Sequence, residues 1–342
     1  MVFAVGAFDY ALKSETGPFG EIVSHGFNGP NLASTTIGSW TESILRDTAL
    51  RPYSFTSPAG SFTYTFNGGG RQPATLAGPG TTTTFSYNAS GWPRNIAVNL
   101  PGQHLVDDHT YSYLANGWIS QIQRINHVTA KYTHDSIGQL TTAQALEPDG
   151  VTVRKNENLG FTYDPAHNLF ARTNNAQVQF FNCDALDQLA SITRSGPMTV
   201  LGSFTGSNIV SMGVNGTNAE VYSDGTFASA TGLIVHDGNN LFVTAGTNNA
   251  GELALSTATS SHLLSSNSFS FDLNGHILSD GQRSFEWDDA DRLTAVSALH
   301  RWRTEFAYDA FSRRRIVREY SWNLNHSGLD SEPSCASRSI EE

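Results

Sequence analysis

A short frame of aromatic residues followed by aspartate recurs along this chain and limits its fold more than any other feature. In one copy, Phe161 stands three positions before Asp164, Tyr163 stands one position before it, and Leu169 follows five positions after it. The frame occurs nine times, always with an aromatic residue at position −3, and Asp or Asn occupies position 0 in eight copies. Position 0 falls at residues 67, 88, 114, 135, 164, 184, 272, 288 and 309. Such a repeat predicts an array of similar units that are stable only when they are stacked.

Each unit has the pattern of a β-hairpin. Residues at positions −3 and −1 are two apart, so both side chains point to one face of a strand. Asp followed three residues later by Gly is typical of a type I turn, in which the Asp side chain accepts a hydrogen bond from the backbone amide two residues along. No helical periodicity is sustained in the sequence. The chain is therefore predicted to be all-β, with an array of stacked antiparallel β-hairpins.

The aromatic residues at position −3 are expected to be mostly buried on one side of a curved antiparallel sheet. Each ring would remove roughly 150–250 Å² from water, and stacked copies would form a continuous aromatic ladder. The residues for which we expect this are Tyr132, Phe161, Phe181, Phe269, Phe285 and Phe306.

The repeat divides the chain into five segments. Hairpin repeats are predicted over 61–196 and 267–322, whereas 1–60 is a β-rich segment without a clear repeat and 323–342 is predicted to be a disordered tail. Between the repeats, 197–266 carries short apolar stretches and the turn pairs Asn215-Gly216, Asp224-Gly225 and Asp237-Gly238. Short strands at that spacing predict a small β-sandwich insert. We expect a separate compact module, so that the strands on either side of it can pair.

The frame resembles the YD repeat of the Rhs family, whose relatives include insecticidal-toxin C components and teneurins. Three stretches are most typical of it: Phe271 to Gly281, Phe285 to Thr294 and Phe306 to Arg315. The resemblance implies that the hairpins spiral into a hollow β-shell, which encloses a C-terminal toxin or is displayed on a cell surface. The insert is similar to bacterial Ig-like modules found in some Rhs-like proteins.

The chain departs from the family in its length and near its end. At 342 residues it is too short to close a full shell, it lacks the core-ending motif at which self-cleavage occurs, and a Ser- and Glu-rich stretch follows Trp322. We therefore interpret it as a fragment or a degenerate member that forms an open part of a β-shell. The expected function is that of a non-catalytic structural or interaction module of a secreted or surface-displayed protein, in a toxin-delivery or adhesion context.

Charge and composition exclude several partners. The net charge of −11 disfavours nucleic acid as a partner. No apolar run reaches the roughly 18 residues of a membrane span. Residues 1–6 lack the basic and apolar regions of a signal peptide, so an extracellular or cell-surface location requires a longer parent protein or another export route. Cys183 and Cys335 alone cannot build a disulfide framework or a zinc site.

Two clusters of charged residues could carry chemistry, but each has a structural interpretation. Asp288, Asp289 and Asp291 form the densest acidic group, in which Asp288 is a turn residue. A basic group is interpreted as a solvated strand face, because acidic residues lie among its arginines. Its members are Arg301, Arg303, Arg313, Arg314, Arg315 and Arg318, with Glu305, Asp309 and Glu319.

Other candidates are weaker. His104, Asp107, Asp108 and His109 form the best metal-like group, although histidines five apart point to opposite faces of a strand. The triplet Gly68-Gly69-Gly70 lacks the Lys-Ser/Thr of a phosphate-binding loop. Glycosylation triplets begin at Asn88, Asn215 and Asn325, and the tryptophans that could stack on sugars or fill the ladder are Trp92, Trp118 and Trp302. We predict no catalytic, cofactor-binding or metal site.

A carbohydrate-binding or carbohydrate-hydrolysing protein is the alternative, using surface aromatic residues and Asp pairs. The partner is accordingly an unknown protein or a polysaccharide. Asp side chains that cap turns would favour the interaction module. Two uncapped carboxylates about 5–10 Å apart in a cleft would favour the carbohydrate-active protein.

Overall fold

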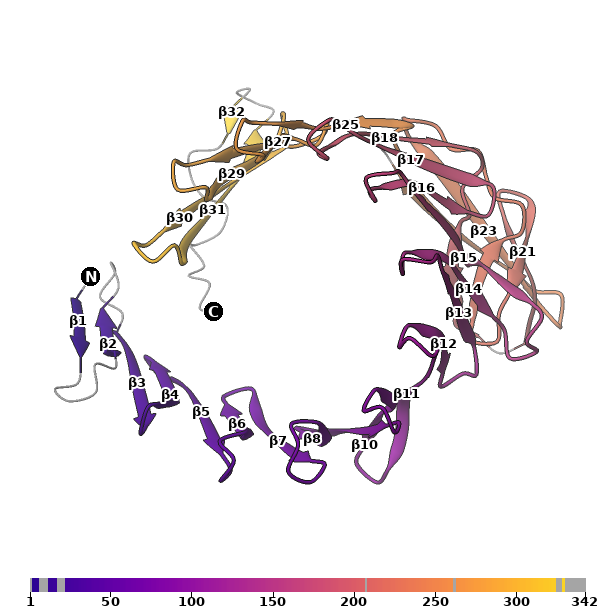
Figure 1. The fold of residues 1–342 in the computed structure, drawn as a ribbon. Coiled ribbons are helices and arrows are strands. Elements are labelled where there is room, and N and C mark those ends of the chain that lie inside the picture. The colour runs from indigo at the N-terminus through magenta and orange to yellow at the C-terminus, as the bar shows by residue number, and fades with distance from the viewer. Residues whose placement is uncertain are drawn as a thin grey trace. The chain divides into compact units, whose positions relative to one another are not determined.

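The computed structural model of the chain describes residues 2–5, 12–16, 22–206, 208–260, 263–323 and 328–329. Every regular element in these ranges is a β-strand, and tight turns join most of the strands into antiparallel hairpins (Figure 1). The all-β class and the array of stacked antiparallel hairpins are therefore confirmed. No helix in these ranges is long and apolar enough to cross a membrane. Most of the predicted tail, 323–342, lies outside the described residues.

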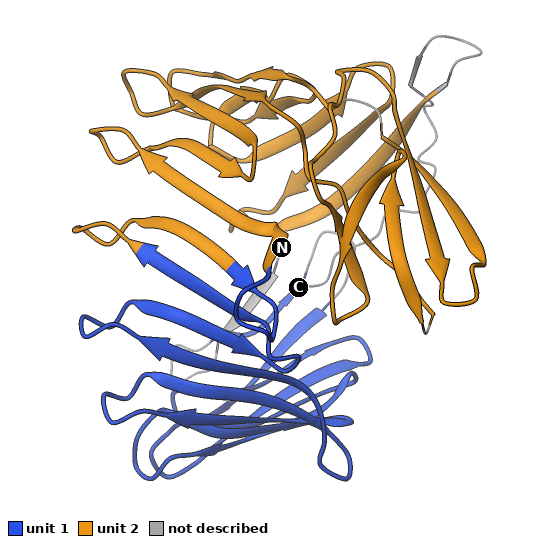
Figure 2. Cartoon of the chain, turned by 90° about the vertical axis from the view of Figure 1, so that its right-hand side faces the viewer, with its two compact units in different colours: residues 1–133, 145–152 blue, residues 134–144, 153–342 orange. Residues whose placement is uncertain are grey.

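The chain divides into two compact units, residues 1–133 with 145–152 and residues 134–144 with 153–342 (Figure 2). From β1 to β13, each strand pairs antiparallel with the strands before and after it. These strands are β1 (Val2–Val5), β2 (Leu12–Thr16), β3 (Ile22–Asn28), β4 (Asn31–Ile37), β5 (Trp40–Arg46), β6 (Pro52–Ser57), β7 (Gly60–Phe66), β8 (Pro73–Gly78), β9 (Thr81–Tyr87), β10 (Pro93–Leu100), β11 (His104–Tyr113), β12 (Ile119–Arg124) and β13 (Thr129–His134). The ladder therefore includes strands of the segment 1–60.

In the second unit a hairpin ladder is interrupted by an insert. Strands β15 to β18 pair in chain order, and β26 to β31 form a further antiparallel sheet. The strands outside the insert are β14 (Leu140–Leu146, which crosses the unit boundary), β15 (Val153–Tyr163), β16 (Leu169–Asn174), β17 (Gln177–Cys183), β18 (Leu189–Ser195), β25 (Ser266–Ser268), β26 (Ser270–Phe271), β27 (Ile277–Ser279), β28 (Ser284–Trp287), β29 (Leu293–Ala298), β30 (Trp302–Tyr308), β31 (Arg314–Asn323) and β32 (Gly328–Leu329).

The insert leaves the ladder after β18, and the chain returns directly beside that strand. Ile192 of β18 lies opposite Asn267 of β25, so the strands that flank the insert pair with each other. The insert itself is a six-stranded antiparallel sheet in the order β19-β22-β21-β20-β23-β24. Its strands are β19 (Leu201–Ser203), β20 (Ile209–Val214), β21 (Thr217–Val221), β22 (Thr226–Ser229), β23 (Asn240–Asn248) and β24 (Leu253–Ser260).

The described part of the insert does not form a two-sheet Ig-like sandwich. Met212, Val214 and Phe227 make a buried core on its single sheet, and Val200 and Leu233 from the connecting segments pack against it. Strand spacing cannot distinguish this arrangement from a sandwich, because the same short strands can pair within one sheet or two.

A buried arginine joins the insert to β15. The Nη2 atom of Arg154 donates to Oδ2 of Asp224 at 2.9 Å and to the hydroxyl of Thr226 at 2.8 Å. Its guanidinium lies over the ring of Tyr222, whose hydroxyl accepts a hydrogen bond from the Lys155 amide at 2.7 Å. The insert sheet is thus attached to the ladder by polar contacts.

The two faces of the first unit's ladder differ in chemistry. Phe55 lies opposite both Ile44 and Phe62 on the neighbouring strands, which places apolar side chains together on one face. On the other face Thr65 lies opposite Thr75, and their hydroxyls hydrogen-bond at 2.6 Å. Alternation along each strand separates the two sets, as the period of two requires, with a register shift between Thr65 and Phe66.

The expectation that the residues at position −3 are mostly buried is confirmed, although none of them is completely buried. All six keep a small exposed fraction: Tyr132, Phe161, Phe181, Phe269, Phe285 and Phe306. Tyr132, for example, packs against a small cluster of Val128, Ala130 and Ala145. A ring on one sheet face is covered by its neighbours in that face, and complete burial needs a second layer over it.

Candidate functional site

The turn of most repeats is held by the side chain at position 0. Oδ1 of Asp288 accepts hydrogen bonds from the amides of Ala290 at 2.9 Å and Arg292 at 3.0 Å. The residue at position +3, Asp291, has φ 60°, so the loop is a type I turn followed by one left-handed residue. The same pair of amide contacts is made by Asp135, Asp184, Asp272, Asp309 and Asn88. The predicted contact to the amide two residues along is present, and a second contact accompanies it.

Another turn of this kind lies in the segment 1–60. Oδ1 of Asp47 accepts hydrogen bonds from the amides of Ala49 at 2.9 Å and Arg51 at 3.0 Å, and Leu50 has φ 60°. The aromatic frame missed this copy because Ile44 and Arg46 occupy positions −3 and −1. A search for Asp followed five residues later by Pro would have found it.

The second carboxylate oxygen of the turn is also occupied, by the side chain at position +4. Oδ2 of Asp288 accepts from Nε of Arg292 at 2.8 Å, and Oδ2 of Asp309 accepts from Nε of Arg313 at 2.8 Å. These charge-assisted contacts hold the pKa of Asp288 below its ordinary value, the side chain of Arg292 contributing most. A carboxylate bound in this way acts as a turn cap, and donors from the turn contact both of its oxygens.

Side chains at position +4 also reach the turn of the next repeat. Nη1 of Arg292 donates to the carbonyl of Asp309 at 3.2 Å, and Nδ2 of Asn168 donates to Oδ1 of Asp187 at 2.8 Å. His276 lies between two turns, with Nδ1 2.9 Å from Oδ2 of Asp272 and Nε2 3.4 Å from Oδ1 of Asp291. The turns therefore form a connected polar seam along the edge of the ladder.

The aromatic residue at position −1 ties neighbouring repeats together. The hydroxyl of Tyr87 donates to the carbonyl of Pro73 at 2.9 Å, which starts the return strand of the preceding repeat. Four more copies make the same contact: Tyr113 to Pro93, Tyr163 to Leu140, Tyr308 to Leu293 and, through its indole N–H, Trp287 to Ile277. Sequence reasoning assigned this position only to the apolar face and missed its hydrogen bond.

The acidic cluster at 288–291 is a turn. Asp288 is the capping residue, Asp291 is the left-handed residue beside His276, and Asp289 is exposed. The cluster His104, Asp107, Asp108 and His109 lies on β11, where Nδ1 of His109 is 3.5 Å from Oδ2 of Asp107. No group of three or more His, Cys, Asp or Glu side chains among the described residues is arranged to hold a metal ion.

The basic group near the C-terminus is largely matched by acids. Arg303 binds both carboxylate oxygens of Glu286, at 2.6 and 2.8 Å, and its Nε is 3.0 Å from Glu305. Arg314 lies over the ring of Phe306. Arg301 and Arg315 also have partners, and Arg318 lies opposite Glu305.

The remaining sequence candidates lie in strands and turns where the structure describes them. Trp92 packs on Tyr113 with ring centroids 5.2 Å apart, whereas Trp118 is half-buried and Trp302 is exposed. Asn88 caps a turn and Asn215 bonds the backbone of β23, and Gly68 to Gly70 form a turn. Burial, together with nearby carboxylates, raises the pKa of the free Cys183 thiol. Asn325 and Cys335 lie outside the described residues.

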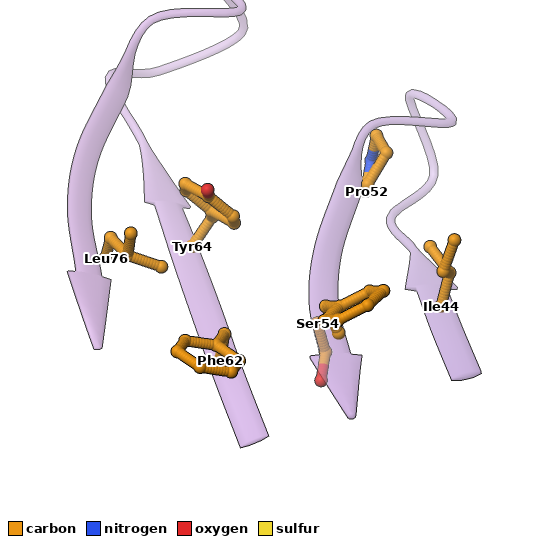
Figure 3. A pocket seen from close by; sticks show the side chains of 7 residues that line it. Ile44, Pro52, Ser54, Phe62, Tyr64 and Leu76 are labelled. Carbon is orange, nitrogen blue, oxygen red and sulfur yellow. The ribbon is translucent and has the colours of Figure 1, made fainter. Parts of the chain in front are cut away.

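An apolar pocket of about 380 Å³ lies on the first unit's ladder. Figure 3 shows Ile44, Pro52 and Ser54 on one side of it and Phe62, Tyr64 and Leu76 on the other. Phe55 completes the lining, and its ring is 6.5 Å from that of Phe62. No charged side chain lines the pocket, so an occupant would be neutral and largely apolar.

The pocket lies where two repeats lack the bridge that position −1 makes elsewhere, although Arg51 donates to the carbonyl of Gly68 in the next turn at 3.0 Å. The pairing of β6 with β7 ends at Ser54 opposite Thr63, and Pro52 lies beyond it. At the next junction Tyr87 bridges the equivalent gap to Pro73. Here the residue at position −1 is Phe66, which has no hydroxyl and stacks instead on the Arg51 guanidinium at 4.3 Å. Because Phe66 has no hydroxyl, it cannot bridge the gap to Pro52 in the way that Tyr87 bridges the gap to Pro73.

Comparison with known proteins gave structural neighbours only. No protein-family model and no curated protein matches the sequence. A crystal structure of TcdB2-TccC3-Cdc42 matches with a TM-score of 0.44 and 13% identity, covering 95% of this chain and 20% of that chain. A crystal structure of TcdB2-TccC3 matches with a TM-score of 0.43 and 13% identity, covering 97% of this chain and 21% of that chain. The present chain spans about a fifth of the length of these neighbours.

Proposed function

We propose that this chain is a non-catalytic interaction module, a stretch of hairpin wall whose aromatic face binds an apolar partner. The observation that carries the proposal is the incomplete burial of that face. The ladder gathers Phe, Tyr and Ile side chains on one side, leaves them partly exposed, and opens an apolar pocket between Pro52 and Tyr64. Apolar side chains that stay partly exposed beside an apolar pocket are typical of a binding surface.

The state of the carboxylates supports the interaction module over the carbohydrate-hydrolysing alternative. Recurrent Asp residues such as Asp288 and Asp309 accept two backbone amides and an arginine side chain. A hydrolase needs two carboxylates that face a substrate across a cleft. Carbohydrate binding without hydrolysis remains the second candidate, because Tyr64, Phe55 and Phe62 form an aromatic lining on which a sugar ring could stack.

The repeat frame supports the wider setting. Its resemblance to the YD repeats of the Rhs family suggests a wall segment of a β-shell in a secreted or surface-displayed protein. Delivery of a toxin and adhesion are the two roles in which such a wall would contact another polypeptide or a surface polysaccharide.

The test is binding of the purified chain to the neutral apolar dye Nile red, to a permanently unfolded reduced polypeptide and to soluble polysaccharides. Phe62→Ser, in the pocket, should weaken dye and polypeptide binding several-fold, whereas Phe311→Ser, at an exposed turn, should not. Circular dichroism establishes that both variants fold. Binding of polysaccharide alone would favour the second candidate, and no binding of any ligand would refute both.

A further inference from the structure

The outer edge of the insert sheet is unprotected. Among the described residues, β24, Leu253–Ser260, is the last strand of the sheet and hydrogen-bonds to β23 on one side only. Seven of its eight residues are exposed, and Leu253 and Leu255 are 62% and 65% exposed. Backbone N–H and C=O groups on the free side of such a strand are a template for another strand.

β24 lacks the devices that usually block edge pairing. The sequence Leu-Ala-Leu-Ser-Thr-Ala-Thr-Ser contains no charged residue and no proline. Its pairing with β23 runs from Asn240 opposite Ser260 to Thr247 opposite Leu253 without a bulge. The other edge of the sheet, β19, has only three residues and is protected by its shortness.

We propose that β24 pairs with β24 of a second copy of this chain and makes an antiparallel two-fold dimer. This inference is independent of the proposed binding by the aromatic face. The dimer would extend the six-stranded sheet across both copies.

Symmetry and charge favour a second copy as the occupant. A two-fold axis perpendicular to the sheet keeps each side chain on its own face and pairs residues whose numbers sum to an even value. With the axis through Ser256, Leu255 faces Thr257 of the second copy and Leu253 faces Thr259. The chain carries a net charge of −11, yet the strand itself has no charge to repel its own copy. In this register Glu252 falls opposite Ser260, so no acid meets an acid.

The geometry also predicts that association stops at two. Each chain contributes one β24, and pairing through a two-fold axis uses the same edge on both copies. The dimer therefore closes and leaves no further β24 edge open.

Sedimentation velocity of the purified chain from about 1 to 200 μM tests the proposal, with far-UV circular dichroism as the check on folding. We expect a concentration-dependent dimer. Leu255→Lys should shift it to monomer by at least tenfold in dissociation constant, because a lysine on an exposed edge blocks strand pairing. Thr257→Lys, on the same strand, should do the same and serves as a second variant if Leu255→Lys does not fold.

Leu273→Lys is the matched control, since Leu273 is fully exposed on a turn outside the insert and undergoes the same chemical change. This variant should still dimerise. The proposal would be overturned if the wild-type chain were monomeric or formed open-ended polymers. It would also be overturned if the dimer persisted with both edge lysines present, or if Leu273→Lys lost the dimer.

Discussion

Removing one tyrosine hydroxyl should loosen the junction between two repeats. In Tyr87→Phe the ring remains and only the donor to the carbonyl of Pro73, now at 2.9 Å, is lost. A hydrogen bond of this kind contributes about 0.5–1.5 kcal/mol net. Burial raises the pKa of Tyr87, and the side chain is half-buried, so we take the middle of that range. We therefore expect a loss of about 1 kcal/mol in the local stability of this junction.

Amide hydrogen exchange followed by mass spectrometry is the appropriate assay, because a repeat array opens locally and a global melt averages over many junctions. A loss of about 1 kcal/mol corresponds to roughly fivefold faster exchange in strands β8 and β9. Exchange in β29 and β30, which belong to the second unit, should not change.

Two further variants make the test specific. Tyr53 is half-buried, and its hydroxyl bonds no described residue, so Tyr53→Phe should leave exchange unchanged. Phe66→Tyr supplies the missing donor next to Pro52 and should slow exchange in β6 and β7. If Tyr87→Phe behaves like Tyr53→Phe, the hydroxyl contact does not tie the repeats together and the reasoning is refuted.

Three other outcomes follow from the same structure. Phe161→Ala should lower the free energy of unfolding by about 2 kcal/mol in a urea titration. This is less than the roughly 3–5 kcal/mol of a fully packed ring, because Phe161 is not completely buried. A loss above about 4 kcal/mol would contradict this reasoning. Folding lowers the pKa of Asp288, so its stabilising effect is present at pH values above the ordinary pKa of 3.8 and is lost as the pH falls through the lower pKa of the folded state. Asp288→Asn should therefore flatten the acid unfolding transition followed by circular dichroism. Arg154→Met should increase protease cleavage within β21 and β22, because it leaves Asp224 without its buried partner, and cleavage equal to that of the wild type would show that the ion pair does not hold the insert.

Much of the local structure follows from the sequence. Asp at position 0 predicts a turn because its side chain reaches amides only two and four residues away, as Asp288 does with Ala290 and Arg292. The alternation of Phe161, Thr162 and Tyr163 predicts which side chains share a face, because strands have a period of two. The pairing of β18 with β25 was also predictable, since repeats on both sides of the insert share one frame.

The candidate pocket could not be predicted in this way. It depends on Pro52 from one hairpin and on Phe66 and Leu76 from the next, and on the absence of a bridge that forms only after two repeats are stacked. The turn at Asp47 was missed for a related reason: its strand positions have lost their aromatic residues, while the turn chemistry has been kept.

The sequence by itself determined the all-β class, the hairpin turns and the separation of an apolar face from a polar one, because these depend on contacts within a few residues along the chain. Only the tertiary structure decided how deeply Phe161 is buried, that Tyr87 bonds Pro73 of the preceding repeat, and that Arg154 anchors the insert through Asp224. Each of these outcomes depends on groups brought together from distant parts of the chain. A single-layer ladder has no second layer over its rings, so only neighbouring side chains on the same face can cover them.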